Sequence, residues 1–201
     1  MIKFIDIDNS EPYKIFNKFY QNALELGQKN IEAVCISSFN SNQNEVSSRF
    51  VNLKYIKGCS WYFFTNYQSP KAKDFLSHKQ VALSIFWNVP NVQIRIKGQI
   101  YLADKLESDS HFISRDLSKN ALAISSDQSR PINSYDDVLS KYNHTIKNII
   151  DEDNIKRPEW WGGFFIKPVY FEFWEGKDNR LNKREEYVLN ENNWISSFLE
   201  P

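Results

Sequence analysis

Short runs of strand-forming residues, each ended by a turn, are the feature that most limits the fold of this chain. Residues 92–102 show the pattern clearly, because Val92, Ile94 and Ile96 are apolar and the residues between them are polar. Such alternation is typical of a strand with one buried and one exposed face. Further strands are expected at 31–39, 46–57, 61–65, 80–87, 160–174 and 187–195. Strands and helices do not alternate regularly, so we expect a mainly β fold, an antiparallel barrel with flanking helices.

Helices are expected at the edges of this barrel. Apolar residues from Tyr13 to Leu24 recur at helical spacing, which predicts an amphipathic helix over about 12–28. Shorter helices are expected at 69–77, 107–115 and 118–126. Ser134 is expected to cap a longer helix whose apolar stripe ends at Ile149. A charged linker, Asp151–Pro158, then leads to the final strands, and residues 1–201 are interpreted as one domain.

Composition excludes several classes of partner and site. The formal net charge of the 201 residues is zero, so we expect no general attraction to nucleic acid or to a membrane surface. Two cysteines are too few for a disulfide framework or a four-cysteine zinc site, and the three histidines have no metal-ligand spacing. Neither a signal peptide nor an apolar run of about 20 residues is present. We therefore expect a cytoplasmic protein without a metal.

Polar residues gather where the run ending at Phe64 passes into a helix. Thr65, Ser69 and Lys71 crowd this corner, which is either a solvated loop or a pocket for an anion. Neither a Walker loop nor a G-x-G-x-x-G motif occurs, and the chain has only six glycines. A phosphate would therefore be held by side chains rather than by a glycine-rich loop.

Other cationic residues stand at the ends of apolar runs. Arg49 and Lys54 belong to one predicted strand, where odd–even spacing places them on opposite faces unless a bulge intervenes. Arg115 and Lys119 are four residues apart and share a face if the helix continues that far. For each of these residues taken alone, an exposed, solvated charge is the more common interpretation.

The order of several motifs resembles that of the pyridoxamine 5′-phosphate oxidase family from about residue 11 to the C-terminus. The segments that carry the resemblance are Arg49-Phe-Val-Asn-Leu-Lys54, Phe64-Thr65-Asn66 with Ser69 and Lys71, Val92-Gln93-Ile94, Phe112-Ile-Ser-Arg115, Ser126-Asp-Gln128-Ser129, Trp161-Gly-Gly163, Phe171-Glu-Phe-Trp174-Glu-Gly176, Arg180-Leu-Asn-Lys-Arg184 and Leu199-Glu-Pro201. Each segment alone is a weak signal, but their order and spacing together are specific.

The resemblance implies a split β-barrel that binds FMN between the two subunits of an obligate homodimer, with residues 160–201 as a dimerisation segment. It implies that Arg49, Thr65 and Lys71 hold the FMN phosphate. The full set of implied cofactor-binding residues is Arg49, Phe50, Val51, Lys54, Phe64, Thr65, Ser69, Lys71, Gln93, Gln128, Ser129, Trp174 and Arg184.

The implied substrate site departs from the family pattern. Its residues by position are Lys54, His111, Arg115, Lys119, Arg180 and Asn182, and the last two are the implied catalytic pair. The family has tyrosine where His111 stands, serine where Lys119 stands and histidine where Asn182 stands. Asn182 keeps a hydrogen bond but cannot take up a proton. Pro70 stands where the family has an arginine just before the lysine that corresponds to Lys71. One positively charged donor is therefore missing, which predicts weaker FMN binding.

These residues lead to one main hypothesis and two alternatives. The main hypothesis is an FMN-dependent oxidase that converts pyridoxamine or pyridoxine 5′-phosphate to pyridoxal 5′-phosphate, with dioxygen as the electron acceptor. One alternative is a related flavin oxidase that acts on another flat compound, such as a phenazine precursor. The other alternative is a non-catalytic flavin-binding protein.

Overall fold

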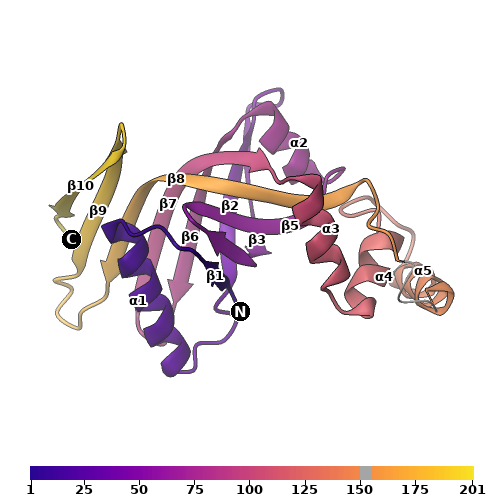
Figure 1. The fold of residues 1–201 in the computed structure, drawn as a ribbon, viewed down its shortest axis with the longest axis horizontal. Coiled ribbons are helices and arrows are strands. Elements are labelled where there is room, and N and C mark those ends of the chain that lie inside the picture. Colours follow the sequence, from indigo (N-terminus) through magenta and orange to yellow (C-terminus); the bar gives the residue numbers. More distant parts are fainter. Residues whose placement is uncertain (150–154) are drawn as a thin grey trace.

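The computed structural model describes residues 1–149 and 155–201 (Figure 1). Within these residues ten strands form one sheet: β1 (Lys3–Ile5), β2 (Ala33–Asn40), β3 (Glu45–Asn52), β4 (Tyr55–Lys57), β5 (Ser60–Asn66), β6 (Gln80–Trp87), β7 (Val92–Leu102), β8 (Trp161–Glu175), β9 (Lys183–Asn190) and β10 (Asn193–Leu199). The helices of the described residues are α1 (Glu11–Glu25), α2 (Pro70–Ser77), α3 (Lys105–Ile113), α4 (Leu117–Ser125) and α5 (Tyr135–Asn148).

The mainly β fold with flanking helices is confirmed, and the sheet is largely antiparallel as expected, although it is mixed and not closed. The strand order is β1-β4-β5-β8-β7-β6-β2-β3. In addition, β9 pairs with β8, and β10 pairs with β9. β1 pairs with β4 in parallel, whereas the other pairs are antiparallel. Within the described residues no pairing joins β1 to β3, so the sheet remains open between these two ends.

The strands predicted at 31–39, 61–65, 80–87, 92–102 and 160–174 lie within two residues of the observed bounds, whereas those predicted at 46–57 and 187–195 are each divided in two. β6 and β7 have the predicted bounds. The single strand expected at 46–57 is divided into β3 and β4 by Leu53 and Lys54. The single strand expected at 187–195 is wrong, because a turn with Glu191 at φ 54° folds this segment into the hairpin of β9 and β10. The polar run Asn190–Asn193 is the turn signal that separates them.

The core lies between α1 and the sheet. Helix α1 buries Tyr13, Phe16 and Tyr20 on the face predicted from their spacing, although it ends at Glu25 rather than near residue 28. Phe16 packs 4.4 Å from Trp61 and 5.8 Å from Trp87, measured between ring centroids. Each fully buried aromatic side chain contributes about 2–3 kcal/mol of hydrophobic stabilisation. This cluster anchors α1 across the sheet seen in Figure 1.

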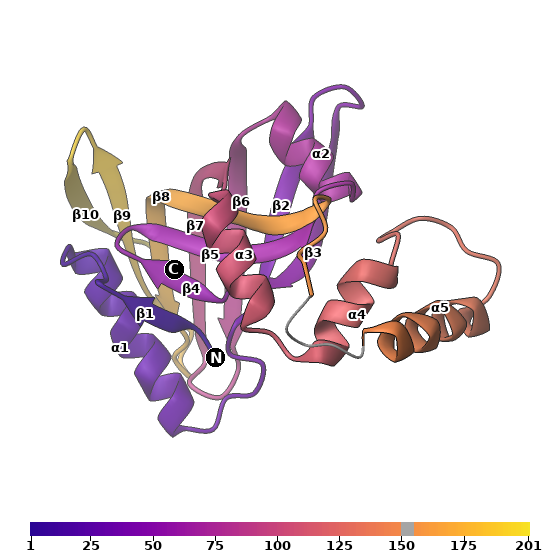
Figure 2. The ribbon, with the colours of Figure 1, turned by 45° about the vertical axis from the view of Figure 1, so that its right-hand side comes forward.

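Helices α3 to α5 lie on another side of the sheet, with α4 and α5 projecting from it (Figure 2). Ser134 caps α5 as predicted, since its hydroxyl accepts a hydrogen bond of 3.1 Å from the Asp137 amide. The predicted apolar stripe of α5 contains no buried residue. Part of the predicted linker Asp151–Pro158, namely residues 151–154, lies outside the described residues.

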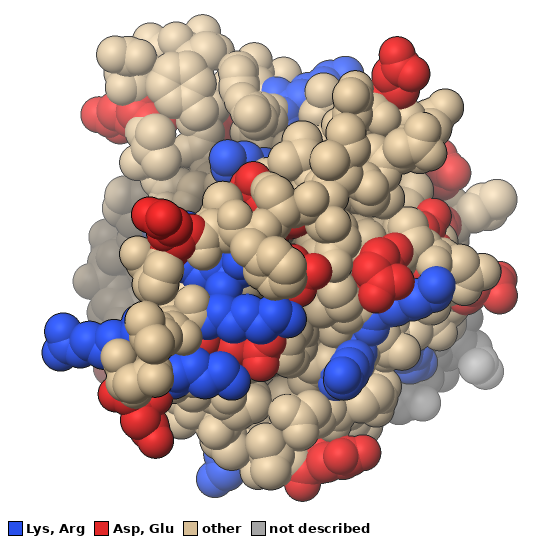
Figure 3. Space-filling view, turned by 90° about the vertical axis from the view of Figure 1, so that its left-hand side faces the viewer, with Lys and Arg blue, Asp and Glu red and all other residues tan. Residues whose placement is uncertain are grey.

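Charges of both signs are mixed on the face formed by α1 and the β9–β10 hairpin (Figure 3). Lys183, for example, lies 3.0 Å from Glu185 and 3.7 Å from Glu175. This mixing agrees with the zero net charge of the chain. In residues 1–149 and 155–201, no helix has both the length and the apolar character needed to cross a membrane.

Candidate active site

A pocket of about 350 Å³ lies where β3, β5, α3 and α4 approach one another. Its walls contain ten of the residues singled out from the sequence: Phe50, Val51, Lys54, Phe64, Thr65, Lys71, His111, Arg115, Lys119 and Gln128. Asn52, Asn66, Leu122, Ala123, Ser126 and Trp161 complete the lining and were not predicted individually. Four of these six belong to motifs quoted above, so their place in those motifs was an available signal: Asn52, Asn66, Ser126 and Trp161.

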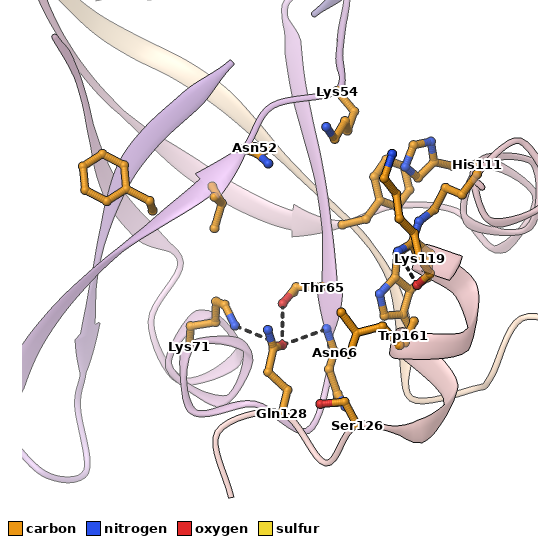
Figure 4. A pocket seen from close by; sticks show the side chains of 16 residues that line it. Asn52, Lys54, Thr65, Asn66, Lys71, His111, Lys119, Ser126, Gln128 and Trp161 are labelled. Atoms are coloured by element: carbon orange, nitrogen blue, oxygen red, sulfur yellow. Dashed lines mark hydrogen bonds between the residues drawn. The ribbon is translucent and has the colours of Figure 1, made fainter. Parts of the chain in front are cut away.

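Hydrogen-bond donors converge at one end of this pocket, which we call the phosphate corner (Thr65, Asn66 and Lys71; Figure 4). The Gln128 Oε1 atom accepts hydrogen bonds from Thr65 Oγ1 at 3.1 Å, Lys71 Nζ at 3.2 Å and the Asn66 amide at 3.4 Å. Three donors that meet at one oxygen form a suitable environment for an anion. Ser69, predicted at this corner, is buried and accepts from Lys71 Nζ at 3.2 Å.

Lys71 is a cation kept away from water. Lys71 has only 8% of its surface exposed. This burial, and secondly the positive charge of Arg49, lower the pKa of Lys71 to about 8. It stands in the first turn of α2, where the unpaired amides of the helix also favour negative charge. Pro70 begins this helix without strain, because its ring suits the first turn.

Arg49 is held beside the phosphate corner by residues that the sequence did not suggest. Its Nη1 donates to Ser38 Oγ at 2.6 Å, and its Nη2 lies 3.6 Å from the Asp74 carboxylate. Asp74 is 4% exposed and also accepts hydrogen bonds from Ser38 and Asn40. Burial lowers the pKa of Arg49 while Asp74 opposes that change. Arg49 thus supplies a second fixed cation close to Lys71.

The opposite end of the pocket, which we call the cationic end, contains Lys54, His111 and Lys119 (Figure 4). Arg115 belongs to it as well, since it also lines the pocket and its charge acts on His111. The Arg115 guanidinium lies 4.4 Å from the Trp161 ring centroid and donates to the Lys119 carbonyl at 2.8 Å. Its Nη1 is buried and has no hydrogen-bond partner in the described part of the chain. A buried guanidinium nitrogen without an acceptor is costly, and a negative charge close to the guanidinium would offset part of this cost.

His111 stays neutral at this end. Its ring stacks on Phe64 at 3.8 Å between centroids, and its Nδ1 lies 2.7 Å from the Tyr55 hydroxyl. Burial, followed by the charges of Arg115 and Lys54, lowers the pKa of His111 to about 3. Burial also lowers the pKa of Lys54, whose Nζ lies 4.0 Å from Glu32.

Three other predicted residues form a row on the outer face of the sheet. Gln93 is paired with Trp174, and Trp174 with Arg184, across β7, β8 and β9. Paired residues of neighbouring strands project on the same side, so the three side chains form one group. Arg184 Nε donates to the buried Glu172 carboxylate at 2.9 Å, and Nη2 lies 2.9 Å from the same oxygen as an ion pair. None of the three lines the pocket.

The remaining predicted residues lie apart from both groups. Arg180 adopts φ 62° in the turn between β8 and β9 and is exposed. The Asn182 Oδ1 atom accepts from the Lys177 amide at 3.0 Å, so it shapes this turn. Ser129 lines a second cavity, of about 220 Å³, next to α4 and α5. The roles implied for all these residues stay predictions.

Two glycines allow close packing at the start of β8. A Cβ atom at Gly162 would lie 2.1 Å from the Tyr67 hydroxyl, and one at Gly163 would lie 2.8 Å from the Ala103 Cβ. Neither position therefore tolerates a side chain without movement of its neighbours. This explains why glycines follow Trp161, whose ring forms part of the pocket wall.

Comparison with known solved structures establishes the fold. PhzG from Burkholderia lata, solved in complex with tetrahydrophenazine-1-carboxylic acid, superposes with a TM-score of 0.89 at 22% identity, over 96% of this chain and 93% of that one. A pyridoxamine 5′-phosphate oxidase-related, FMN binding protein from Nostoc punctiforme gives a TM-score of 0.77 at 12% identity, over 96% and 99%. The chain therefore has the fold of these split-barrel proteins.

Sequence comparison identifies the family of the chain as well as its fold. Residues 22–141 match the family model described as pyridoxamine 5′-phosphate oxidase, and residues 161–201 match the pyridoxine 5′-phosphate oxidase C-terminal dimerisation region. A pyridoxine/pyridoxamine 5′-phosphate oxidase from Pseudoalteromonas atlantica is 35% identical, over 96% of this chain and 90% of that protein. The protein of the same name from Colwellia psychrerythraea is 36% identical, over 96% and 88%. The chain therefore belongs to the pyridoxamine 5′-phosphate oxidase family of FMN-dependent oxidoreductases.

Proposed function

We propose that this protein oxidises pyridoxamine or pyridoxine 5′-phosphate to pyridoxal 5′-phosphate, with dioxygen as the final electron acceptor. The names of its relatives support this substrate class. The observation that carries the proposal is the gathering of Lys54, Arg115 and Lys119 at the cationic end of one pocket. These groups suit a phosphate dianion on the substrate.

The residues of the phosphate corner fit the cofactor. Lys71 and Arg49 would bind the FMN phosphate with charge, and Thr65 would bind it with a hydroxyl hydrogen bond. FMN, when bound, would accept two electrons from the substrate and pass them to dioxygen. The two ends of the pocket are then used for two different phosphates, with Phe64 and Trp161 as the flat apolar wall between them.

Orientation is the main contribution that the cationic end makes to the reaction. Lys54, Arg115 and Lys119 would fix the substrate through its phosphate, and His111 would add a neutral hydrogen bond. Holding a flat substrate in one position supplies a large part of the rate, because the redox chemistry belongs to the cofactor. The same end excludes substrates without an anionic group.

We also propose that a second copy of the chain completes each site. Gln93, Trp174 and Arg184 lie on the outer face, away from the pocket of their own subunit. Phe50 and Phe86, with 74% and 57% of their surface exposed, flank the same face. The match to a dimerisation region supports a homodimer in which this row faces the partner's pocket.

The test is oxidation by the purified protein. Protein saturated with FMN is mixed with pyridoxamine 5′-phosphate in air, and the aldehyde product and hydrogen peroxide are measured together. Equal amounts of both products are expected, and unphosphorylated pyridoxamine should react at least 100-fold less efficiently. A yellow protein that produces neither compound would disprove the proposed reaction.

Asn182 favours a second candidate function. The family pattern has histidine at this position, and Asn182 cannot exchange a proton with a substrate. A flavin oxidase for another flat anionic compound, such as a phenazine precursor, would explain the change. Profiling both compound classes on the same preparation separates the two candidates. A preparation that takes up FMN but oxidises neither class of compound would instead favour a flavin-binding protein without catalysis.

A further inference from the structure

The hydrogen bond between Tyr55 and His111 is not explained by the roles given above. Tyr55 lies on β4 and His111 on α3, 56 positions apart in the chain, and their polar atoms are 2.7 Å apart. The two rings also meet edge to face, with 5.3 Å between centroids. Phe64 stacks on a face of the imidazole, with 3.8 Å between ring centroids. The orientation of the imidazole is thus fixed on two sides.

The second ring nitrogen of His111 is available to a ligand. His111 lines the pocket, and its Nε2 makes no hydrogen bond within residues 1–149 and 155–201. The same atom is not one of the buried, unpartnered side-chain atoms, whereas Nη1 of the neighbouring Arg115 is. Nε2 therefore keeps access to the space in front of the cationic end.

The charges around the imidazole are mostly positive. Lys3 on β1, Lys54 before β4, Lys57 on β4 and Arg115 after α3 all surround it. The nearby carboxylate on α3, Glu107, is paired with Lys57 at 2.8 Å. Lys54, Arg115 and Lys119 already carry three positive charges against the two of a phosphate dianion. A fourth charge on the imidazole is therefore not required when such a ligand binds.

We infer that Tyr55 is a positioning residue: its hydroxyl donates to Nδ1 of His111 and leaves the single ring proton on Nε2, where it donates to the bound anion. This inference rests on the proposed function, because it assigns the anion to the phosphate of the substrate. A tyrosine hydroxyl is protonated at neutral pH and can donate, and a neutral imidazole has one donor and one acceptor. A lone pair on Nε2 would repel the anion, so only this tautomer suits both neighbours.

The direct test is the tautomer of His111. FMN-saturated protein labelled with nitrogen-15 in histidine is titrated with inorganic phosphate at pH 7.5, and the ring nitrogen shifts are measured by NMR. The chain has only three histidines, so a His111→Gln sample assigns the signal. A neutral ring with its proton on Nε2 is the expected result. A doubly protonated ring, or a proton on Nδ1, would overturn the inference.

A double-variant comparison tests whether Tyr55 acts through His111. Tyr55→Phe keeps the ring packing and removes the hydroxyl, and it is expected to raise KM for pyridoxamine 5′-phosphate about fivefold with little change in kcat. His111→Gln places an amide donor near the position of Nε2 and no longer needs Tyr55. In the His111→Gln background, Tyr55→Phe should change KM less than twofold. If Tyr55 had a purely structural role, Tyr55→Phe would raise KM by the same factor in the wild-type and His111→Gln backgrounds.

A matched control and a separate readout complete the test. Tyr101→Phe also removes a tyrosine hydroxyl, which donates to Gln99 at 2.5 Å outside the pocket, and should leave KM unchanged. The NMR result does not depend on turnover. If the protein failed to oxidise pyridoxamine 5′-phosphate but showed the Nε2 tautomer with phosphate, the proposed reaction would fail and the role of Tyr55 would stand.

Discussion

The carboxylate of Asp74 on α2 lies 3.6 Å from a guanidinium nitrogen of Arg49 on β3, so opposite charges tie a helix to an edge strand. Asp74 is 4% exposed and Arg49 has a side-chain exposure of 21%. The pair is therefore sheltered from water, and removing one partner leaves the other without compensation.

Asp74→Ala is expected to lower the free energy of unfolding by about 2–3 kcal/mol, since it leaves Arg49, Ser38 and Asn40 without their common acceptor. Urea denaturation followed by tryptophan fluorescence measures the change. Lys73→Ala is the control, because Lys73 is exposed on the same helix and should change stability by less than about 0.5 kcal/mol. Equal effects of the two substitutions would contradict the role given to Asp74.

FMN affinity is expected to decrease as the pH rises above about 8. The pKa of Lys71 is lowered to about 8, so its amine is charged below that pH and neutral above it. The FMN phosphate binds the charged amine and raises its pKa. Above pH 8 the free amine must therefore take up a proton when FMN binds, and this requirement weakens binding as the pH rises. Quenching of flavin fluorescence measures Kd from pH 6.5 to 9.5. Lys71→Arg keeps the charge and should remove this pH dependence, whereas a wild-type Kd that does not change above pH 8 would disprove the prediction.

Two inactive variants are expected to complement one another if each site uses residues of both subunits. Lys71→Met removes a charge from the pocket, and Arg184→Ala removes one from the outer row. A mixed dimer has one intact site and one doubly altered site, so random mixing should restore about a quarter of the wild-type activity. Co-expression of the two differently tagged chains provides the sample. Activity no higher than that of either parent would place both residues in the same subunit's site.

Asn182→His is expected to introduce a titrating group near the substrate. With a histidine of ordinary pKa at this position, kcat for pyridoxamine 5′-phosphate should acquire a pH dependence centred near about 6.5. A protonated imidazole cannot accept the hydrogen bond that the Lys177 amide donates to Asn182 Oδ1, so a stability loss of about 1 kcal/mol is also expected at low pH. Steady-state kinetics from pH 5.5 to 8.5 measure the effect, and Asn179→His in the same turn is the control. Identical pH profiles of Asn182→His and the wild type would show that residue 182 does not approach the substrate.

Gly162→Ala is expected to destabilise the protein by about 1–3 kcal/mol, because its Cβ would overlap the Tyr67 hydroxyl. Thermal unfolding of the single variant measures the loss. Tyr67→Phe removes the hydroxyl that causes the closest overlap, so the double variant should recover part of the stability. A double variant that is less stable than the sum of both single losses would rule out this contact as the cause.

The sequence predicted the parts of the fold that depend on local pattern. β7 was predicted to its ends because apolar and polar residues alternate along it without interruption. The sequence predicts one strand at 187–195, because alternation there is weak and the polar run Asn190–Asn193 then looks like part of a strand rather than a turn. The spacing in α5 predicts an amphipathic helix, but it does not say what the apolar stripe contacts.

The candidate site was predicted mainly through motif order, and its internal contacts were not. The pairing of Tyr55 with His111 depends on how α3 lies against β4, which neither segment encodes alone. Asp74 follows Lys71 by three positions in α2, and helical spacing alone could have suggested that an acid lies near this basic corner. The separation of the outer row from the pocket required the three-dimensional register of β7, β8 and β9.

The register that aligns Gln93, Trp174 and Arg184 limits where insertions and deletions are tolerated in the chain. Because neighbouring residues of a strand point to opposite sides, deleting one codon within β8 before Trp174 would move the tryptophan to the core-facing position of Phe173 and put Glu175 in the place of Trp174. The loop between α4 and α5 carries no such alternation. Length variation among descendants of this chain should therefore accumulate in that loop and be absent from the three strands.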